Sequence, residues 1–476
     1  MYDASLYVAG ERISRTAQPT FEVINPANEE VLGVAPTAGP DEIAAAVASA
    51  ERALAVWSGA SAFERSNVLR RIATLLRERA DPIATLMTLE IGKPIAEARG
   101  EVMSAAEYFD WAAEETRRIQ GYELGARVAE SRYRVSHEPV GIVLALTAWN
   151  YPVILPARKL AMALAAGCPV ILRPAEEAPA CVTALVACCH DAGLPPGAVN
   201  LLLGSPEAVV EPLMAEPKVR KVSFTGSTRV GQILIRQSAE TVKRLTLELG
   251  GHAPFLVLED ADVAKAAAAA ALGKFRNAGQ VCTAPSRFYV HEKVCEEFSE
   301  RMTALAGGLR LGEGIDPAVQ MGPLATARQR DRAERLVEDA RAKGARLLCG
   351  GLRPQAFNRG FFFEPTVMSE VPPDAQLMTE EPFCPVAAIT AFSDLDQAVA
   401  QANASEFGLA AYVFSRREGE DVARRLEAGV VGLNTVAVAA PEAPFGGVKQ
   451  SGFGREGGRE GVQDYLSAKF VHAVRT

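Results

Sequence analysis

Short apolar runs alternate with segments of helical spacing through the middle of the chain. Between residues 140 and 258 the apolar runs are VGIVLAL, CPVILRP, VNLLLG and VRKVSFTG. Helical patterns follow them at LPARKLAMALAAG, at Pro179 to Gly193, near residues 206–215, and at Thr228 to Ser238. Strands that alternate with helices in this way predict right-handed βαβ units around a parallel sheet.

The alternation resumes after residue 254 and predicts a second α/β domain. PFLVLE and RFYVH are typical of buried strands, and helices are expected over residues 261–275 and 296–306. Residues before 120 have mostly helical patterns, whereas SRYRVSHEP alternates as an exposed strand does. We find no internal repeat and no low-complexity linker.

Length, charge and hydropathy limit the number of domains and the kinds of protein that this chain can be. A chain of 476 residues is too long for one simple core, so two large domains are expected. The net charge of −8 disfavours nonspecific nucleic-acid binding, which needs a basic surface. The longest apolar region, Pro139 to Pro174, is broken by Arg158, Lys159 and prolines, so no membrane span is predicted. The N-terminal MYDASLYVAGERIS has no secretory pattern.

The eight cysteines favour neither a metal site nor a disulfide framework. None forms a CxxC pair, and no HxxxH completes a ligand set, so no metal is predicted. CCH at 188–190 lies in a helical run, where small apolar residues pack. Unpaired cysteines in this number fit a reducing, cytoplasmic compartment.

A strand leads directly into a helix at SFTGSTRVG, which contains Gly226, Ser227 and Gly231. Backbone amides at such a helix N-terminus favour a phosphate group. The alternative is an ordinary strand–turn–helix joint with a serine cap. The motif is not GxGxxG, so by itself it does not decide between a phosphate site and a plain joint.

Three polar or aromatic residues stand at the ends of predicted strands. LTLELGG places Glu248 where active sites of parallel α/β proteins form, and a surface acid at a turn is the alternative. ALTAWNYP places Trp149 and Asn150 at the end of another strand. The Asn150 amide could donate to a developing oxyanion, or it could simply stabilise a turn.

KFRNAGQVCTAPSR contains Cys282, which has no histidine within eight positions. A reactive cysteine needs a pKa lowered from about 8.5 by a helix dipole or a cation, whereas most lone cysteines are inert core residues. A cysteine hydrolase would need a histidine base. His252 and His291 exist, but neither has a supporting motif.

Together these motifs are far more specific than any one of them. LELGG followed by NAGQVC, with 34 residues from Glu248 to Cys282, resembles the aldehyde dehydrogenase superfamily, whose members use NAD(P) and a catalytic thiol. The resemblance runs from VINPANEEVLG to APFGGVKQSGFGREGG and YLSAKF, which is essentially the whole chain. EEPFCPV departs from the family at Cys384, where the family has glycine.

The resemblance implies a role for each motif. The Cys282 thiolate would attack the aldehyde carbon, and Asn150 with the Cys282 backbone amide would hold the oxyanion. Oxidation by the cofactor would leave a thioester, which Glu248 would hydrolyse by activating water. Because Glu248 is present, a carboxylic acid is favoured over a CoA thioester as the product. A cysteine-dependent hydrolase remains the alternative from another class.

The resemblance also implies the cofactor site. Glu381 and Phe383 match positions that contact the nicotinamide ribose and ring, and Trp149, Gly226, Ser227 and Gly231 would lie along the cofactor. Family members often have lysine at Arg173 and, in NAD users, glutamate at Glu176. A carboxylate accepts hydrogen bonds from the ribose 2′-OH, so NAD is expected before NADP. Arg173 could pair with a phosphate, which keeps NADP possible.

The substrate is predicted from two arginines. Arg158 and Arg276 match the carboxylate clamp of the semialdehyde branch, whose typical substrates are succinate and 2-oxoglutarate semialdehydes. An interdomain ion pair is the alternative. The clamp's usual hydroxyl should lie in AVAAPEAPF, which offers only alanine and proline at those places, so a different acid or an uncharged aldehyde stays open. Ala284 stands where some members carry a second, redox-active cysteine.

The expected architecture is α/β and aldehyde dehydrogenase-like. A Rossmann-like NAD(P)-binding domain is predicted from residues 1–121 and 141–250, and a catalytic α/β domain from 251–450. By resemblance, 122–140 and 468–476 would form a small β element for oligomerisation. Exposed strands of this kind pair between subunits, so a homodimer or homotetramer is expected.

Overall fold

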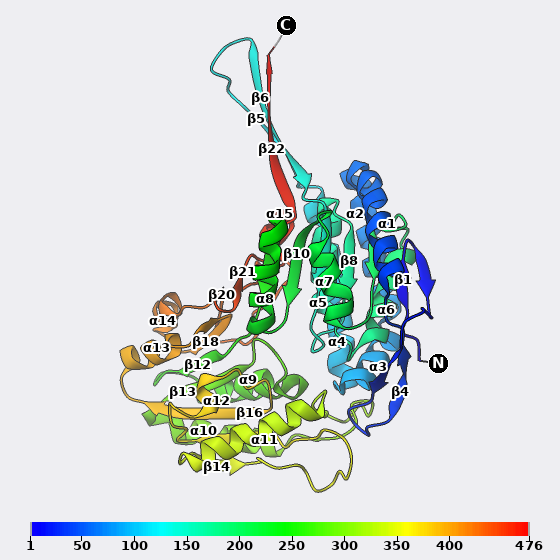
Figure 1. Ribbon diagram of the computed structural model, residues 1–476. Helices are drawn as coiled ribbons and strands as arrows, with labels where there is room; N and C mark the ends of the chain where they lie inside the picture. Colours follow the sequence, from blue (N-terminus) through cyan, green and yellow to red (C-terminus); the bar gives the residue numbers. More distant parts are fainter. Residues whose placement is uncertain (1, 475–476) are drawn as a thin grey trace.

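The computed structural model describes residues 2–474, which fold around two sheets with a long β extension (Figure 1). The first sheet has five parallel strands in its centre and antiparallel strands at both ends. In spatial order its strands are β2 (Glu11–Ile13), β1 (Leu6–Val8), β9 (Val199–Leu201), β8 (Val170–Arg173), β7 (Ile142–Leu146), β10 (Val219–Thr225), β11 (Arg244–Glu248) and β21 (Gly452–Phe453). The predicted parallel sheet is therefore confirmed.

Helices pack on this sheet because the contact removes their apolar faces from water. They are α1 (Pro40–Gly59), α2 (Ala62–Glu78), α3 (Ala80–Ile91), α4 (Ile95–Thr116), α5 (Ile154–Ala166), α6 (Pro179–Asp191), α7 (Pro206–Ala215) and α8 (Thr228–Ser238). Helix α5 is buried from Leu155 to Ala166 and ends at Gly167, which has a positive φ of 89°. Within residues 2–474, no helix combines the length and apolarity needed to cross a membrane.

The second sheet has its own hydrophobic core. Its strands, in spatial order, are β14 (Arg346–Cys349), β15 (Thr366–Ser369), β16 (Val386–Phe392), β13 (Pro285–His291), β12 (Ala253–Val257), β18 (Ala410–Phe414) and β19 (Val430–Leu433). The helices of this part are α9 (Val263–Phe275), α10 (Glu292–Gly307), α11 (Ala327–Ala342), α12 (Gln376–Thr379), α13 (Leu395–Asn403) and α14 (Gly419–Arg425). All strands except β14 are parallel.

Helix α10 begins four residues before the predicted start at 296. The His291 side chain accepts a hydrogen bond from the Lys293 backbone and caps the helix there, which the hydrophobic period alone does not reveal. Short elements complete the fold. They are the hairpin β3 (Phe21–Ile24) with β4 (Val31–Ala35), the pair β17 (Phe407–Gly408) with β20 (Val448–Lys449), and the turns η1 (Ala239–Thr241) and η2 (Arg276–Gly279).

A three-stranded sheet projects from the body at the top of Figure 1. It contains β5 (Tyr122–Leu124), β6 (Ser131–Pro139) and β22 (Leu466–Val474). Strand β22 pairs antiparallel with β6 from Leu466 opposite Pro139 to Val474 opposite Ser131. It begins two residues before the predicted 468, and 475–476 lie outside the described residues. The role of this sheet in oligomerisation stays a prediction.

The chain between residues 451 and 467 returns to the first sheet. Strand β21 pairs with β11, with Gly452 opposite Glu248. Helix α15 (Gly458–Gln463) then packs against α5 and α4. The predicted boundaries left this stretch unassigned, since two-residue strands and six-residue helices carry almost no periodic signal.

Candidate active site

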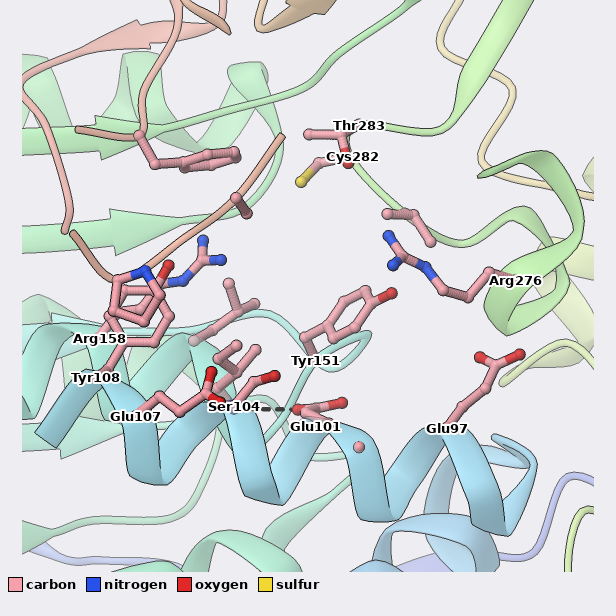
Figure 2. Close-up of a pocket in the computed structure, with 17 residues that line it drawn as sticks. Glu97, Glu101, Ser104, Glu107, Tyr108, Tyr151, Arg158, Arg276, Cys282 and Thr283 are labelled. Atoms are coloured by element: carbon pink, nitrogen blue, oxygen red, sulfur yellow. Dashed lines mark hydrogen bonds between the residues drawn. The ribbon is translucent and has the colours of Figure 1, made fainter. Parts of the chain in front are cut away.

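A cavity of about 380 Å³ opens in front of Cys282. One face of α4 forms its floor in Figure 2, and Arg158 and Arg276 reach toward it from opposite sides. Its lining side chains include Glu97, Glu101, Ser104, Glu107, Tyr108, Tyr151, Ile154, Leu155, Arg158, Arg276, Val281, Cys282, Thr283, Ala439, Pro441 and Phe445. Segments from both halves of the chain therefore meet at one thiol.

The loop that carries Cys282 has an unusual backbone. Asn277, Ala278 and Gly279 all have positive φ, at 49°, 53° and 73°. Two such non-glycine residues in succession persist only where surrounding contacts hold them. The buried Gln280 side chain supplies such contacts, since Nε2 donates to the Asn277 carbonyl at 2.9 Å and Oε1 accepts from the Ala325 amide at 2.9 Å.

Asn150 is fixed beside this loop. The side-chain Nδ2 of Asn150 donates to the Gln280 backbone carbonyl at 3.0 Å. The backbone carbonyl of Asn150 accepts from Lys93 Nζ at 2.9 Å and from Asn277 Nδ2 at 3.0 Å. Lys93 is in turn held by a buried ion pair with Glu101. A side-chain amide has two N–H donors, so one remains for a ligand. Asn150 itself is not among the residues that line the cavity, and its role in holding an oxyanion stays a prediction.

The Cys282 thiol does not have the low pKa expected of a reactive cysteine. Burial raises its pKa to about 12, Arg158 and Arg276 oppose that rise, and Glu248 and Glu381 add to it. Two cationic neighbours are present, but the loss of hydration outweighs them. Burial therefore favours the protonated form of the thiol in this arrangement.

Glu248 ends β11, as predicted, and is 3% exposed. Neither carboxylate oxygen has a hydrogen-bond partner within the described chain. Burial and the nearby Glu456 raise its pKa well above the usual value, while Lys159 and Arg158 lower it. Lys159 and Glu456 form a buried ion pair. Glu248 is not among the side chains that line the cavity, so a water molecule would have to connect it with a bound substrate.

Neither Arg158 nor Arg276 forms the interdomain ion pair with an acidic side chain that was the alternative interpretation of these residues. The Arg158 guanidinium carbon lies 4.8 Å from the ring centres of both Tyr108 and Phe445, and its Nε has no hydrogen-bond partner. The Arg276 guanidinium carbon lies 5.9 Å from the ring centre of Tyr151. No carboxylate within residues 2–474 lies in ion-pair distance of either guanidinium, so both cations are available to a ligand.

The proposed phosphate motif forms the N-terminus of α8. Ser227 caps the helix by accepting from the Val230 amide at 3.4 Å. A Cβ at Gly226 would lie 2.3 Å from the Phe224 ring, and one at Gly231 would lie 2.7 Å from Leu249. Gly231 is therefore needed for packing of α8 against the chain after β11. The free amides of the first turn leave a cradle that fits a phosphate.

Arg173 is engaged within the protein at the end of β8. Its Nε and a terminal nitrogen donate to the Gly204 carbonyl at 2.9 and 2.7 Å. The Glu176 carboxylate lies 3.5 Å from the guanidinium and is the more exposed of the two. Burial lowers the pKa of Arg173, and Glu176 opposes that change. The guanidinium is therefore partly satisfied before any cofactor phosphate arrives.

The third group of predicted cofactor contacts lies near the glycine pair after β11. Glu381 Oε1 accepts from the Gly251 amide at 3.0 Å, and burial raises the pKa of this carboxyl to about 7. Phe383 has a positive φ of 49° and meets the Trp149 ring edge-on, with centres 5.6 Å apart. An aromatic wall beside a carboxylate fits a nicotinamide riboside. Cys384 is buried in the second core.

Sequence reasoning missed several residues of this site. Glu97, Glu101, Ser104 and Tyr108 recur at helical spacing along α4 and share the face that lines the cavity. That spacing was visible in the sequence, but nothing there indicated that the face would meet Cys282. Within residues 2–474, no cluster of histidine, cysteine or acidic side chains has the arrangement of a metal site.

Comparisons with known proteins agree with the geometry. The aldehyde dehydrogenase family profile matches residues 13–471. A 3-sulfolactaldehyde dehydrogenase of Pseudomonas putida is 45% identical over 98% of this chain and 96% of its own length. The NADP(+) succinate-semialdehyde dehydrogenase GabD of Escherichia coli strain K12 is 43% identical over the same shares. A crystal structure of succinate-semialdehyde dehydrogenase from Burkholderia pseudomallei superposes with a TM-score of 0.97, at 43% identity, covering 99% of this chain and 98% of that one.

Proposed function

The chain belongs to the aldehyde dehydrogenase family, and from that premise we propose that it oxidises an aldehyde with a distal acid group to the corresponding carboxylate. NAD or NADP is the oxidant. The observation that supports an acid group on the substrate is that Arg158 and Arg276 both line the cavity of Cys282 and have no carboxylate partner.

Cys282 is the proposed nucleophile. Its deprotonated sulfur attacks the aldehyde carbon, and the new C–S bond leaves an alkoxide on the former carbonyl oxygen. The free N–H of the Asn150 amide and the Cys282 backbone amide would donate to that oxygen. One such donor typically contributes about 3 kcal/mol to the transition state. When bound, the nicotinamide cofactor supplies the two-electron oxidation that converts this adduct to a thioester.

Glu248 is the proposed base of the hydrolytic half-reaction. A carboxylate takes a proton from water as the hydroxyl attacks the thioester carbon, and the Cys282 sulfur leaves. Burial raises the pKa of Glu248, which makes its carboxylate a stronger base than an exposed one. Its two unpartnered oxygens fit a residue that hydrogen-bonds to water during part of the cycle.

An acid group on the substrate would satisfy the two arginines. A buried guanidinium without a partner is unfavourable, since its charge loses hydration and gains nothing in return. Arg158 is 7% exposed and has no carboxylate partner. Succinate semialdehyde and 3-sulfolactaldehyde, the substrates in the names of two relatives, each carry an acid group besides the aldehyde. Carboxylate and sulfonate substrates are thus both within the proposal.

A cysteine hydrolase has less support. No histidine lines the cavity. His252 is buried, and its Nε2 is hydrogen-bonded to the Leu377 carbonyl at 3.2 Å. The arrangement therefore lacks the base that such an enzyme needs.

The test is reduced-cofactor production with two aldehydes of equal length, succinate semialdehyde and butanal. The proposal expects kcat/KM at least tenfold higher for the acid, because a single desolvated charge pair contributes more than about 1.4 kcal/mol. Equal values would favour a broad-specificity enzyme for uncharged aldehydes, and no reduced cofactor with either would favour the hydrolase.

The projecting sheet supports homo-oligomerisation, as a dimer or a tetramer. Its strands leave Tyr122, Leu124, Phe470 and Val474 exposed, and apolar side chains on open strands favour pairing with another subunit. All eight cysteines are free thiols, which supports a reducing, cytoplasmic setting. Sedimentation velocity of the purified protein tests the first of these points.

A further inference from the structure

Two tyrosine hydroxyls in the cavity wall have no hydrogen-bond acceptor in the described chain. Tyr108, on α4, is 2% exposed, and Tyr151 lies in the segment between β7 and α5. The Oη atoms of both are buried, and neither donates a hydrogen bond to an acceptor in the described chain. Both residues line the cavity of Cys282. Buried hydroxyls are normally hydrogen-bonded, so two unsatisfied hydroxyls in the wall of one cavity indicate that a ligand binds there.

Each of these hydroxyls is paired with one of the unpaired arginines. Arg158 lies over the ring of Tyr108, with 4.8 Å from the guanidinium carbon to the ring centre. Arg276 lies 5.9 Å from the ring centre of Tyr151, and Figure 2 shows the Tyr151 hydroxyl turned toward it. The cavity wall therefore carries two phenol–guanidinium pairs, one on each side of the thiol.

All four groups of these pairs are hydrogen-bond donors. Burial is the main cause that raises the pKa of both tyrosines, so each phenol keeps its proton at neutral pH. A guanidinium has no lone pair with which to accept that proton. The acceptor for each hydroxyl must come from outside the pair, and the group that best complements two cations and two hydroxyl donors is an anion with several oxygens.

The segment 437–445 offers no hydroxyl to such an anion. Ala439, Pro441 and Phe445 are its contributions to the cavity lining, and none has a polar side-chain atom. The two tyrosines stand on other walls of the same cavity. They can supply the neutral donors that this segment lacks.

We propose that the Tyr108 and Tyr151 hydroxyls donate to the distal anionic group of the substrate and, together with Arg158 and Arg276, form its binding site. This inference rests on the proposed oxidation of an acid-bearing aldehyde. The group recognised is a carboxylate or a sulfonate, which share anionic oxygens as acceptors. The tyrosines are specificity-determining residues here, while the chemistry at the aldehyde remains with Cys282.

The experiment replaces each tyrosine by phenylalanine, which removes one oxygen and keeps the ring. Purified Tyr108→Phe and Tyr151→Phe are compared with wild type on succinate semialdehyde, on 3-oxopropanesulfonate, and on butanal. Hydrogen bonds to charged groups are strong enough that kcat/KM for an acidic aldehyde should fall about tenfold in each variant. The loss should appear mainly in KM, and the value for butanal should change less than about twofold.

Tyr289→Phe is the matched control. Tyr289 is buried beside Arg287, with 5.9 Å from the guanidinium carbon to its ring centre, but it does not line the cavity. It therefore reproduces a buried phenol–guanidinium pair without access to the substrate. Its acid-to-butanal ratio should equal that of wild type. Inhibition by succinate, which needs no turnover, should weaken about tenfold in the two cavity variants and remain unchanged in the control.

The outcomes separate this inference from the proposed function. A wild type that prefers the acids, with Phe variants that keep the same preference and the same inhibition by succinate, overturns the role of the hydroxyls and leaves the proposed function intact. Equal losses for acids and butanal also overturn it, because they indicate a structural effect. A wild type without any preference overturns both. A selective loss on either acid supports the assignment, and the acid with the higher kcat/KM identifies the distal group.

Discussion

The backbones of Gly279 and Cys384 are in close contact, and Gly279 lies three residues before Cys282. A Cβ at position 279 would lie only 2.2 Å from the Cys384 carbonyl oxygen. Cys384 follows Phe383 directly, so the loop of the thiol and the loop of the proposed nicotinamide contacts are pressed together. The position of the Cys282 sulfur thus depends on Gly279, which is part of the sequence motif, and on Cys384, which is not.

Replacing Gly279 by alanine should therefore lower both stability and activity. The new methyl group meets a carbonyl oxygen, and φ at this position is positive at 73°, which together should destabilise the protein by about 2 kcal/mol or more. Thermal unfolding and kcat measure the two effects. Gly307→Ala is the control, because a Cβ there meets nothing within 4 Å. Similar effects for both variants would show that the contact has no special role.

Variants of Cys282 and Glu248 should affect different steps of the reaction, oxidation and thioester hydrolysis respectively. Cys282→Ala should abolish turnover and any initial burst of reduced cofactor, because no adduct forms. Glu248→Gln should keep a burst of one equivalent and then turn over slowly, because the thioester accumulates. Stopped-flow absorbance of the reduced cofactor measures both phases. Loss of the burst in Glu248→Gln would mean that this residue is also needed to deprotonate the thiol.

Turnover should rise as the pH increases above the usual titration range of a carboxyl group. Burial raises the pKa of Glu248, and only the deprotonated carboxylate acts as a base, so its active fraction grows as pH increases. The prediction is checked by measuring kcat from about pH 6 to about pH 9 under thioester-limited conditions. The slower turnover of Glu248→Gln should lose this rise. An unchanged pH profile in the variant would assign the titration to another group.

Each arginine should matter for acidic substrates only. Removing one buried charge partner costs about 2–5 kcal/mol, so Arg158→Ala should lower kcat/KM for succinate semialdehyde by tens-fold or more. Arg276 is exposed, so Arg276→Ala should lower it by a smaller factor. Butanal should lose far less. Arg301→Ala, which removes a surface arginine paired with Glu297, serves as the control. Comparable losses for both aldehydes would point to a structural role for the two cavity arginines.

The cofactor preference should follow Glu176. Its carboxylate can accept from a ribose 2′-OH and repels a 2′-phosphate, while Arg173 is already donating to the Gly204 carbonyl. Wild type should have a higher kcat/KM with NAD than with NADP, and Glu176→Ser should shift the ratio toward NADP. A wild type that prefers NADP by tenfold, about 1.4 kcal/mol, would show that Arg173 sets the choice.

Local pattern was sufficient for the order of the strands and helices between residues 140 and 306. The strand–helix alternation predicted the parallel sheets, because apolar runs and helical spacing are properties of neighbouring residues. Helix α8 runs from Thr228 to Ser238, the limits expected from sequence. Glu248 stands at the end of β11, and the family resemblance carried by its spacing from Cys282 is confirmed by the comparisons.

Only the tertiary structure decided what surrounds those residues. The burial that raises the pKa values of Cys282 and Glu248 comes from segments far away in the chain, and so does the Glu456 charge beside Glu248. Tyr108 lies 174 positions before Cys282, yet both line one cavity. The physical reason is that a sequence pattern specifies the face an element buries but not the partner it meets, and hydration, charge and hydrogen bonding depend on that partner.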